Sequence, residues 1–135
     1  MEKYYPQFVT NLQMFLGKLN KTCPSKDITD FLNVFEKIDM IKVVIKYLSE
    51  MRVVEKGLLE RNSEIFNKSL KPLPGINLKN FWKKIPEDEQ NDYWNMLQIL
   101  YVLAEQMVSA SKGEQKEERK QLIEKMTGNI KEHSD

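Results

Sequence analysis

Cysteine and histidine are almost absent from this chain: its 135 residues include one cysteine, Cys23, and one histidine, His133. A single cysteine cannot form an internal disulfide, which favours a reducing, intracellular compartment. One Cys and one distant His cannot build a zinc site, and Cys23 has no base nearby in the sequence to activate it as a nucleophile. We therefore expect no metal, no catalytic residue and no enzymatic activity.

Glycine, proline and long apolar runs are also scarce, with five glycines and five prolines. An all-β fold would need a turn about every 8–12 residues, so this scarcity favours helices. The segment PLPGINLKN matches neither the P-loop nor the dinucleotide fingerprint. No run approaches the ~20 apolar residues of a membrane span, and MEKYYPQF lacks the blocks of a signal peptide. We expect an intracellular protein with no membrane association, no cofactor and no small-molecule substrate.

Net charge is nearly zero, at +1, with 41% hydrophobic and 30% charged residues. These values are ordinary for a globular domain, and the length suits one domain. Because there is no global field to attract nucleic acid, such binding would need a local patch. The acidic run Glu87-Asp88-Glu89 lacks the ligand spacing of a calcium loop and suits the first turn of a helix.

Apolar residues recur at spacings of three and four, which is typical of amphipathic helices. Residues 4–19 carry the first such stripe, and a second helix follows with Ser25 or Asp27 as its cap. Asp39 is expected to cap a third helix, in which Val43-Val44-Ile45 is read as helix because the chain has no second strand-like run. Residues 53–67 predict an interrupted helix, with Ser63 as the cap of its last turn. The stripe of residues 4–19 consists of Tyr5, Phe8, Val9, Leu12, Phe15, Leu16 and Leu19.

The stretch 77–107 holds both tryptophans and the densest apolar run. We interpret the tryptophans mainly as anchors of the core. Asn77 is expected to cap a short helix that ends before Pro86, and Pro86 then begins a long helix to about Lys112. The sequence thus predicts an all-α, single compact domain of five to six helices with a long central helix near 86–112. Residues 1–112 form the helical core domain, and 113–135 form a charged C-terminal helix or tail, peripheral or dependent on a partner.

Two groups of residues are candidates for binding. The segment 68–84 has five lysines and no acidic residue, so it could contact phosphates or a partner while Trp82 stacks on a base. A solvated face of a short helix explains the same lysines. The thin apolar seam of the C-terminal segment could dock on the body of the protein or on a second copy. The first group is Lys68, Lys71, Lys79, Trp82, Lys83 and Lys84; the seam is Leu122, Ile123, Met126 and Ile130.

Three motifs lie within a similarity that spans roughly residues 8–105: FLGKLNKTCPS, then RNSEIF, then INLKNFWKKIPEDEQNDYWNMLQILYVLAEQ. Together they resemble a family of small proteins encoded by giant viruses, the nucleocytoplasmic large DNA viruses of algae and amoebae. Its members show a phenylalanine-leucine helix running into a T-F-P-E turn, an S/D-E-x-I-F segment, and W-x-x-L followed by W-x-Y-L-Q-x-L-Y. Cys23 and Ser25 stand where Phe and Glu are common, and Met96 replaces the usual Tyr. The matching residues are Leu16, Thr22 and Pro24, then Glu64, Ile65 and Phe66, then Trp82, Ile85, Trp94, Leu97, Gln98, Leu100 and Tyr101.

The resemblance implies a viral origin and an all-helical domain, and it brings no activity with it. We expect a non-enzymatic protein that acts through protein–protein contact or self-association, as a virion or viral-factory component in the host cytoplasm. The first alternative is a nucleic-acid-associated factor that uses the lysines of 68–84. A weaker alternative is a helical mimic that binds a host regulatory protein through a groove between its helices.

Overall fold

The computed structural model describes residues 3–112 and 117–132, and in these residues the chain forms seven α-helices, two short 3-10 helices and no strand. Five of the α-helices have eight or more residues, whereas α4 and α5 are about one turn each. The buried side chains form one continuous hydrophobic core. The prediction of a single all-α domain with a long central helix is therefore confirmed. None of the helices described is both long enough and apolar enough to cross a membrane.

The first two helices follow from their apolar spacing and their end signals. α1 (Tyr5–Thr22) buries Phe8, Leu12, Phe15, Leu16 and Leu19, which belong to the predicted stripe. It ends two residues before Pro24, because proline disfavours helical geometry in the residue that precedes it. Ser25 caps α2 (Lys26–Asn33) by accepting a 3.2 Å hydrogen bond from the backbone N–H of Asp27.

After the 3-10 turn η1 (Phe35–Lys37), Asp39 caps α3 (Met40–Val53), as predicted, and Val43-Val44-Ile45 is helical. The next segment is more irregular. α4 (Glu55–Leu59) is followed by the 3-10 turn η2 (Ser63–Asn67), which is capped by Asn62, one residue before the expected Ser63.

The side chain of Asn77 organises the loop before α5 (Lys79–Trp82). Its Oδ1 accepts hydrogen bonds from the N–H groups of Lys79, at 3.2 Å, and of Leu70, at 3.1 Å. The N–H of Asn80 donates to the backbone carbonyl of Asn77 at 3.0 Å. The structure places Leu78, not the predicted Asn77, at the N-cap position of α5, and Asn77 instead fixes the preceding loop to the start of this helix.

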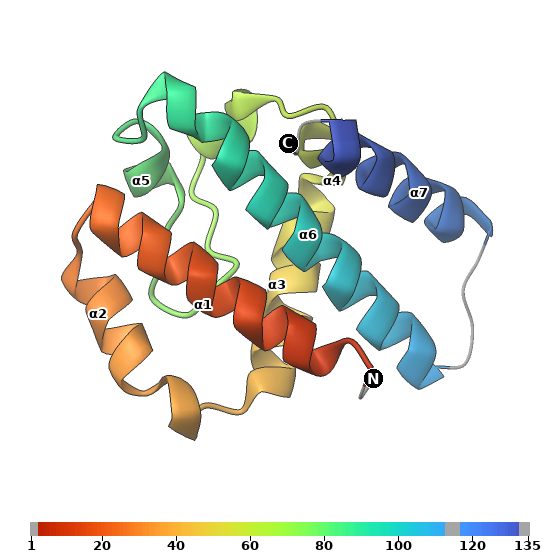
Figure 1. The fold of residues 1–135 in the computed structure, drawn as a ribbon, viewed down its shortest axis with the longest axis horizontal. Helices are drawn as coiled ribbons and strands as arrows, with labels where there is room; N and C mark the ends of the chain where they lie inside the picture. The colour runs from red at the N-terminus through yellow and green to blue at the C-terminus, as the bar shows by residue number, and fades with distance from the viewer. Residues whose placement is uncertain (1–2, 113–116, 133–135) are drawn as a thin grey trace.

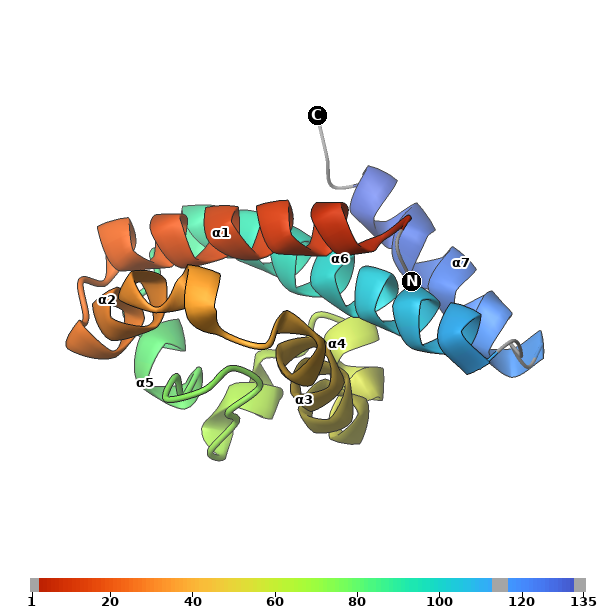
Figure 2. The same ribbon diagram turned by 90° about the horizontal axis from the view of Figure 1, so that it is seen from below.

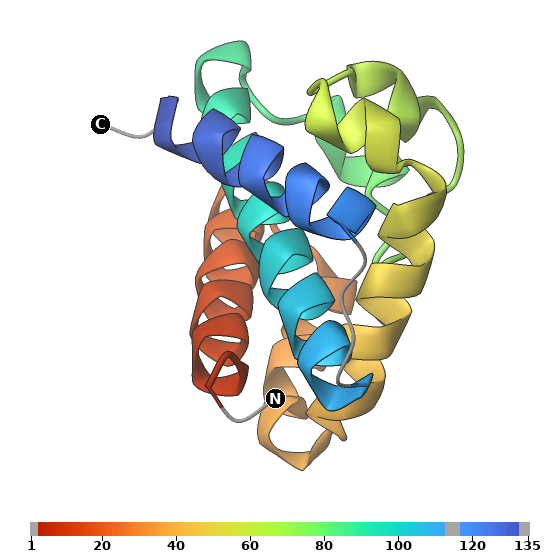
Figure 3. The ribbon, with the colours of Figure 1, turned by 90° about the vertical axis from the view of Figure 1, so that its right-hand side faces the viewer.

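α6 (Glu87–Lys112) is the central element and packs against α1, α3, α4 and α7. Figure 1 shows it running diagonally through the molecule, and Figure 3 shows α1 and α3 on opposite sides of it. Two buried tyrosines fix these contacts. Tyr47 of α3 donates a 2.6 Å hydrogen bond to the Leu97 carbonyl, and Tyr93 of α6 donates to Thr22 Oγ1 of α1 at 2.8 Å.

The C-terminal helix α7 (Glu117–Glu132) packs against α6 and α4. It crosses the outer side of α6 in Figure 3, and in Figure 2 it lies on the α1–α6 side of the molecule. Residues 113–116 and 133–135 of the predicted C-terminal segment lie outside the described residues.

Candidate functional site

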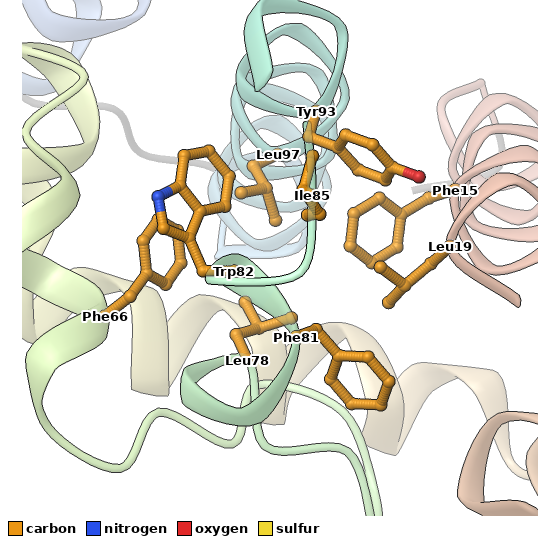
Figure 4. Close-up of a pocket in the computed structure, with 9 residues that line it drawn as sticks. All are labelled: Phe15, Leu19, Phe66, Leu78, Phe81, Trp82, Ile85, Tyr93 and Leu97. Carbon is orange, nitrogen blue, oxygen red and sulfur yellow. The ribbon is translucent and has the colours of Figure 1, made fainter. Parts of the chain in front are cut away.

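An apolar pocket lies where α1, η2, α5 and α6 meet (Figure 4). Its volume of about 10 Å³ is at the lower limit for a single water molecule, and its walls are aromatic or aliphatic. The one hydroxyl among them, on Tyr93, points toward α1 and bonds there. The pocket is therefore a small packing defect with no room for a ligand. Its walls are Phe15, Leu19, Phe66, Leu78, Phe81, Trp82, Ile85, Tyr93 and Leu97.

Trp82 is part of this core, as its main interpretation predicts, and the alternative role of Trp82 as a stacking platform is wrong. The side chain is 8% exposed, and its ring stacks on Phe66 with centroids 4.3 Å apart. The ring of Trp94 also packs against Trp82, edge to face, with ring centroids 4.9 Å apart. Because both neighbours occupy the ring surface that a base would need, Trp82 cannot stack on nucleic acid in this fold.

The five lysines of segment 68–84 are all exposed: Lys68, Lys71, Lys79, Lys83 and Lys84. Lys68 and Lys71 lie on the chain after η2, and the other three lie on or just after α5. This exposure fits phosphate contact and a solvated surface equally well, so the lysines alone do not choose between the two hypotheses.

The predicted apolar seam of the C-terminal segment is turned toward the body of the same chain. Met126 is fully buried in the core, and Leu122 packs against that core. Ile123 and Ile130 are half-buried. Of the two predicted dockings, the structure shows the one onto the body, so Met126 is not available to a second copy while α7 stays in this position.

An open groove lies beside the C-terminal end of α3, between that helix, η2 and the chain after η2. We call it the Val53 groove. Its volume is about 530 Å³, and Val53 on its rim is 84% exposed. Val54, Ile65 and Leu70 add apolar surface, and charge is supplied by Glu50, Glu64 and Lys68. Asn62, Asn67 and Ser69 complete the lining, so the groove combines apolar and polar surface, as protein-binding sites commonly do.

A network of charged side chains joins α7 to α4 and α6. Nη1 and Nη2 of Arg119 donate to the two carboxylate oxygens of Glu55 at 3.0 and 2.7 Å. Nε and Nη2 donate to the two oxygens of Glu105 at 3.0 Å each. One guanidinium group therefore binds two carboxylates, each bidentately, which is the geometry that favours arginine over lysine.

Tyr101 and Arg52 complete this network. We call the site that receives the Arg119 guanidinium the Arg119 socket; it consists of Glu55, Tyr101 and Glu105, with Arg52 at its edge. The Tyr101 hydroxyl donates to Glu55 and accepts from Arg119. Arg52 Nη2 donates to Glu105 at 2.5 Å. Since the side chain of Glu105 is only 4% exposed, its charge depends on these two arginines.

The electrostatics of the socket follow from burial and these hydrogen bonds. Burial, followed by the hydrogen bond to Glu55, raises the pKa of Tyr101 to about 12, so the phenol stays protonated. Burial acts to raise the pKa of Glu105, but the hydrogen bonds and charges of Arg119 and Arg52 outweigh it and lower that pKa. The hydrogen bonds that Arg119 donates to Glu105 and Glu55 raise the pKa of Arg119. At neutral pH, two carboxylates and two guanidinium groups balance each other.

A second arginine, Arg61, ties the α4–η2 turn to α6. Its guanidinium donates to the side-chain oxygens of Asn91 and Asn95 at 2.6 Å each and of Gln98 at 2.9 Å. Gln98 is fully buried, and its amide donates in turn to the Leu58 carbonyl. These contacts hold Arg61 at φ 54°, which is uncommon for a residue other than glycine. The cluster therefore has a structural role: it holds the α4–η2 turn against α6.

The sequence interpretation missed both arginine clusters, although one compositional signal was present. Only three of the 21 basic residues are arginines, at positions 52, 61 and 119, and all three bind oxygens of α6. A second signal was Glu105, an acidic residue four positions after Tyr101 on the buried face of the central helix. Neither signal identifies a partner, because the clusters join residues 14 to 64 positions apart.

In the described part of the chain, no three His, Cys, Asp or Glu side chains are grouped so that they could hold a metal ion. Comparison with models of protein families, with curated proteins and with solved structures gave no match. The resemblance to the giant-virus family therefore stays a prediction.

Proposed function

We propose that this chain is a non-enzymatic helical protein that works by binding another protein through the Val53 groove. The observation that carries the proposal is Val53 itself, an aliphatic side chain left 84% exposed on the rim of a groove of about 530 Å³. Burying an exposed aliphatic side chain in a partner interface contributes about 1.5–3 kcal/mol. The adjacent Val54 and Ile65 extend the apolar surface that a partner would cover.

The proposed setting is the virion or the viral factory of a large DNA virus, in the host cytoplasm. This part of the proposal rests on the motif resemblance alone. A variant of this proposal is that the partner is a host regulatory protein. In that case the chain imitates a host helical module and binds the regulatory protein through the same groove.

A photo-crosslinking amino acid at Val53 tests the proposal, with the same residue at Met14 as the matched control. Met14 is a second exposed apolar residue, 61% exposed, on α1. Both full-length chains are expressed in infected cells, and the products are identified by mass spectrometry. We expect a discrete heteromeric product from position 53 that position 14 does not give. The same products from both positions, or none from position 53, contradict the proposal.

The second candidate function is nucleic-acid binding, favoured by the exposure of all five lysines between residues 68 and 84. If all five contact phosphates, the logarithm of the DNA association constant should fall against log salt with a slope of about −4.5. Lys83→Ala with Lys84→Ala should then reduce the slope by about 2, whereas Lys42→Ala with Lys46→Ala on α3 should not. Absence of DNA binding at low salt removes this candidate.

A further inference from the structure

The helix α7 presents a single face to α4 and α6, and that face has a regular pattern. Arg119, Leu122, Met126 and Asn129 follow one another at spacings of three, four and three residues, which places them on one side of a helix. Arg119 fills the socket at one end of the contact. Near the other end, the side-chain amide of Asn129 donates a 2.9 Å hydrogen bond to the carbonyl of Leu59, the last residue of α4.

The surface that receives α7 is specific for a guanidinium group. Glu55 and Glu105 approach it from two different helices, and each offers both of its oxygens. The Tyr101 hydroxyl accepts from it as well. Without Arg119, Arg52 would still bind Glu105, but Glu55 would lose the cation with which it is paired. The site would then carry uncompensated negative charge in a half-buried position.

The apolar part of the α7 contact is small in comparison. Met126 is the one side chain of residues 119–132 that is fully buried, whereas α1 buries five. Within the helix, Gly128 has no side chain to pack, and the Thr127 hydroxyl bonds back to the Ile123 carbonyl. Glycine lowers helix propensity, and such back-bonding slightly destabilises a helix. The other buried apolar residues of the core all lie outside α7.

We propose that the groove between α4 and α6 is a binding site for an amphipathic helix bearing arginine, that α7 occupies it in cis, and that the matching helix of a partner protein takes its place. The partner helix presents an arginine to Glu55 and Glu105, aliphatic residues three and seven positions later, and a polar side chain ten positions later. This inference does not rest on the proposed function, because the Val53 groove is lined by different residues.

The test uses a fluorescein-labelled peptide of residues 117–132 as the partner helix and full-length protein as the receptor. In one receptor, Arg119→Ala with Met126→Asp removes the two side chains that hold α7. Fluorescence anisotropy should show the peptide binding this receptor at least tenfold more tightly than the wild-type protein. Arg119→Lys in the peptide should weaken binding at least tenfold, because lysine cannot engage both carboxylates bidentately, and Lys120→Ala, at an exposed position, should leave it unchanged.

A second receptor keeps every residue of the α7 contact. It serves as a control in case the substitutions in the first receptor prevent that protein from folding. In the second receptor a protease site replaces residues 113–116, and the chain is cut there after folding. Excess labelled peptide should then exchange with the cut α7 on gel filtration. Val53→Glu should change neither result, which separates failure of this inference from failure of the proposed function. The inference is overturned if the cut protein keeps its own α7 and takes up no peptide, or if the Arg119→Lys peptide binds equally well.

Discussion

At the residue scale, Arg61 shows how a single side chain can fix a turn whose backbone is unfavourable. It adopts φ 54° and donates to three side-chain oxygens of α6. Arg61→Ala removes the donor that the fully buried Gln98 Oε1 accepts from. We expect a loss of about 2 kcal/mol of unfolding free energy, measured by urea denaturation. Lys56→Ala, at an exposed position of the adjacent helix, should stay within about 0.5 kcal/mol of wild type.

A second prediction at the residue scale concerns Glu105 and the pH dependence of the unfolding free energy. Because its pKa is lowered in the folded protein by Arg119 and Arg52 against the effect of burial, its ionised form stabilises the fold above its ordinary pKa of 4.5. That contribution is lost as pH falls through the lowered pKa. Wild type should therefore exceed Glu105→Gln in unfolding free energy at pH 7, and the difference should shrink steadily below about pH 4.5. A difference that is constant from pH 3 to 7 contradicts this assignment.

At the element scale, two glycines in helices make opposite predictions. A Cβ at Gly57 in α4 would lie 2.3 Å from Cγ2 of Ile65, a methyl next to the η2 backbone, so the α4–η2 contact needs glycine. Gly57→Ala should destabilise by about 1–3 kcal/mol. Gly17 in α1 has no neighbouring atom within 4 Å of its Cβ position, and Gly17→Ala should stabilise by about 0.5–1 kcal/mol. Thermal unfolding of the two variants checks both signs.

Helix α7 carries the other prediction at this scale. Arg119→Ala should remove protection against hydrogen exchange in the amides of residues 122–130 while leaving the protection of α3 and α6 in place. The reason is that Arg119 holds α7 through the socket, whereas Tyr47 and Tyr93 fasten α3 and α1 to α6 independently. Lys120→Ala is the matched control. Equal loss of protection in α6 would show that α7 is inseparable from the core.

The same scale shows what the sequence could predict. Apolar periodicity is a local property, so it correctly marked the five buried residues of α1, although Tyr5 of the same predicted stripe is exposed. The caps Ser25 and Asp39 depend on near neighbours and were also predicted. The core role of Trp82 was predicted, but its neighbours were not, because Phe66 and Trp94 lie 16 and 12 residues away. The Arg119 socket is out of reach of local reasoning, because it unites α3, α4, α6 and α7 in space.

At the scale of the whole molecule, α6 organises the fold, and the two binding proposals concern different surfaces of the described residues. One is the Val53 groove, which is open. The other lies between α4 and α6 and is filled by α7. The five exposed lysines are the features that a nucleic-acid function would use. The two binding proposals are independent, because the substitutions that test them are at different residues.

The central claim is tested most directly with the partner protein that crosslinks to position 53. That partner is purified, and its affinity for this chain is measured. The partner is titrated against three full-length chains: wild type, Val53→Glu and Met14→Glu. If the partner covers the Val53 groove, the glutamate buries a charge in the interface, and the affinity should fall at least about tenfold, since 1.4 kcal/mol is a factor of ten. Met14→Glu should bind like wild type. A Val53→Glu chain that is folded and binds the partner as tightly as wild type contradicts the claim.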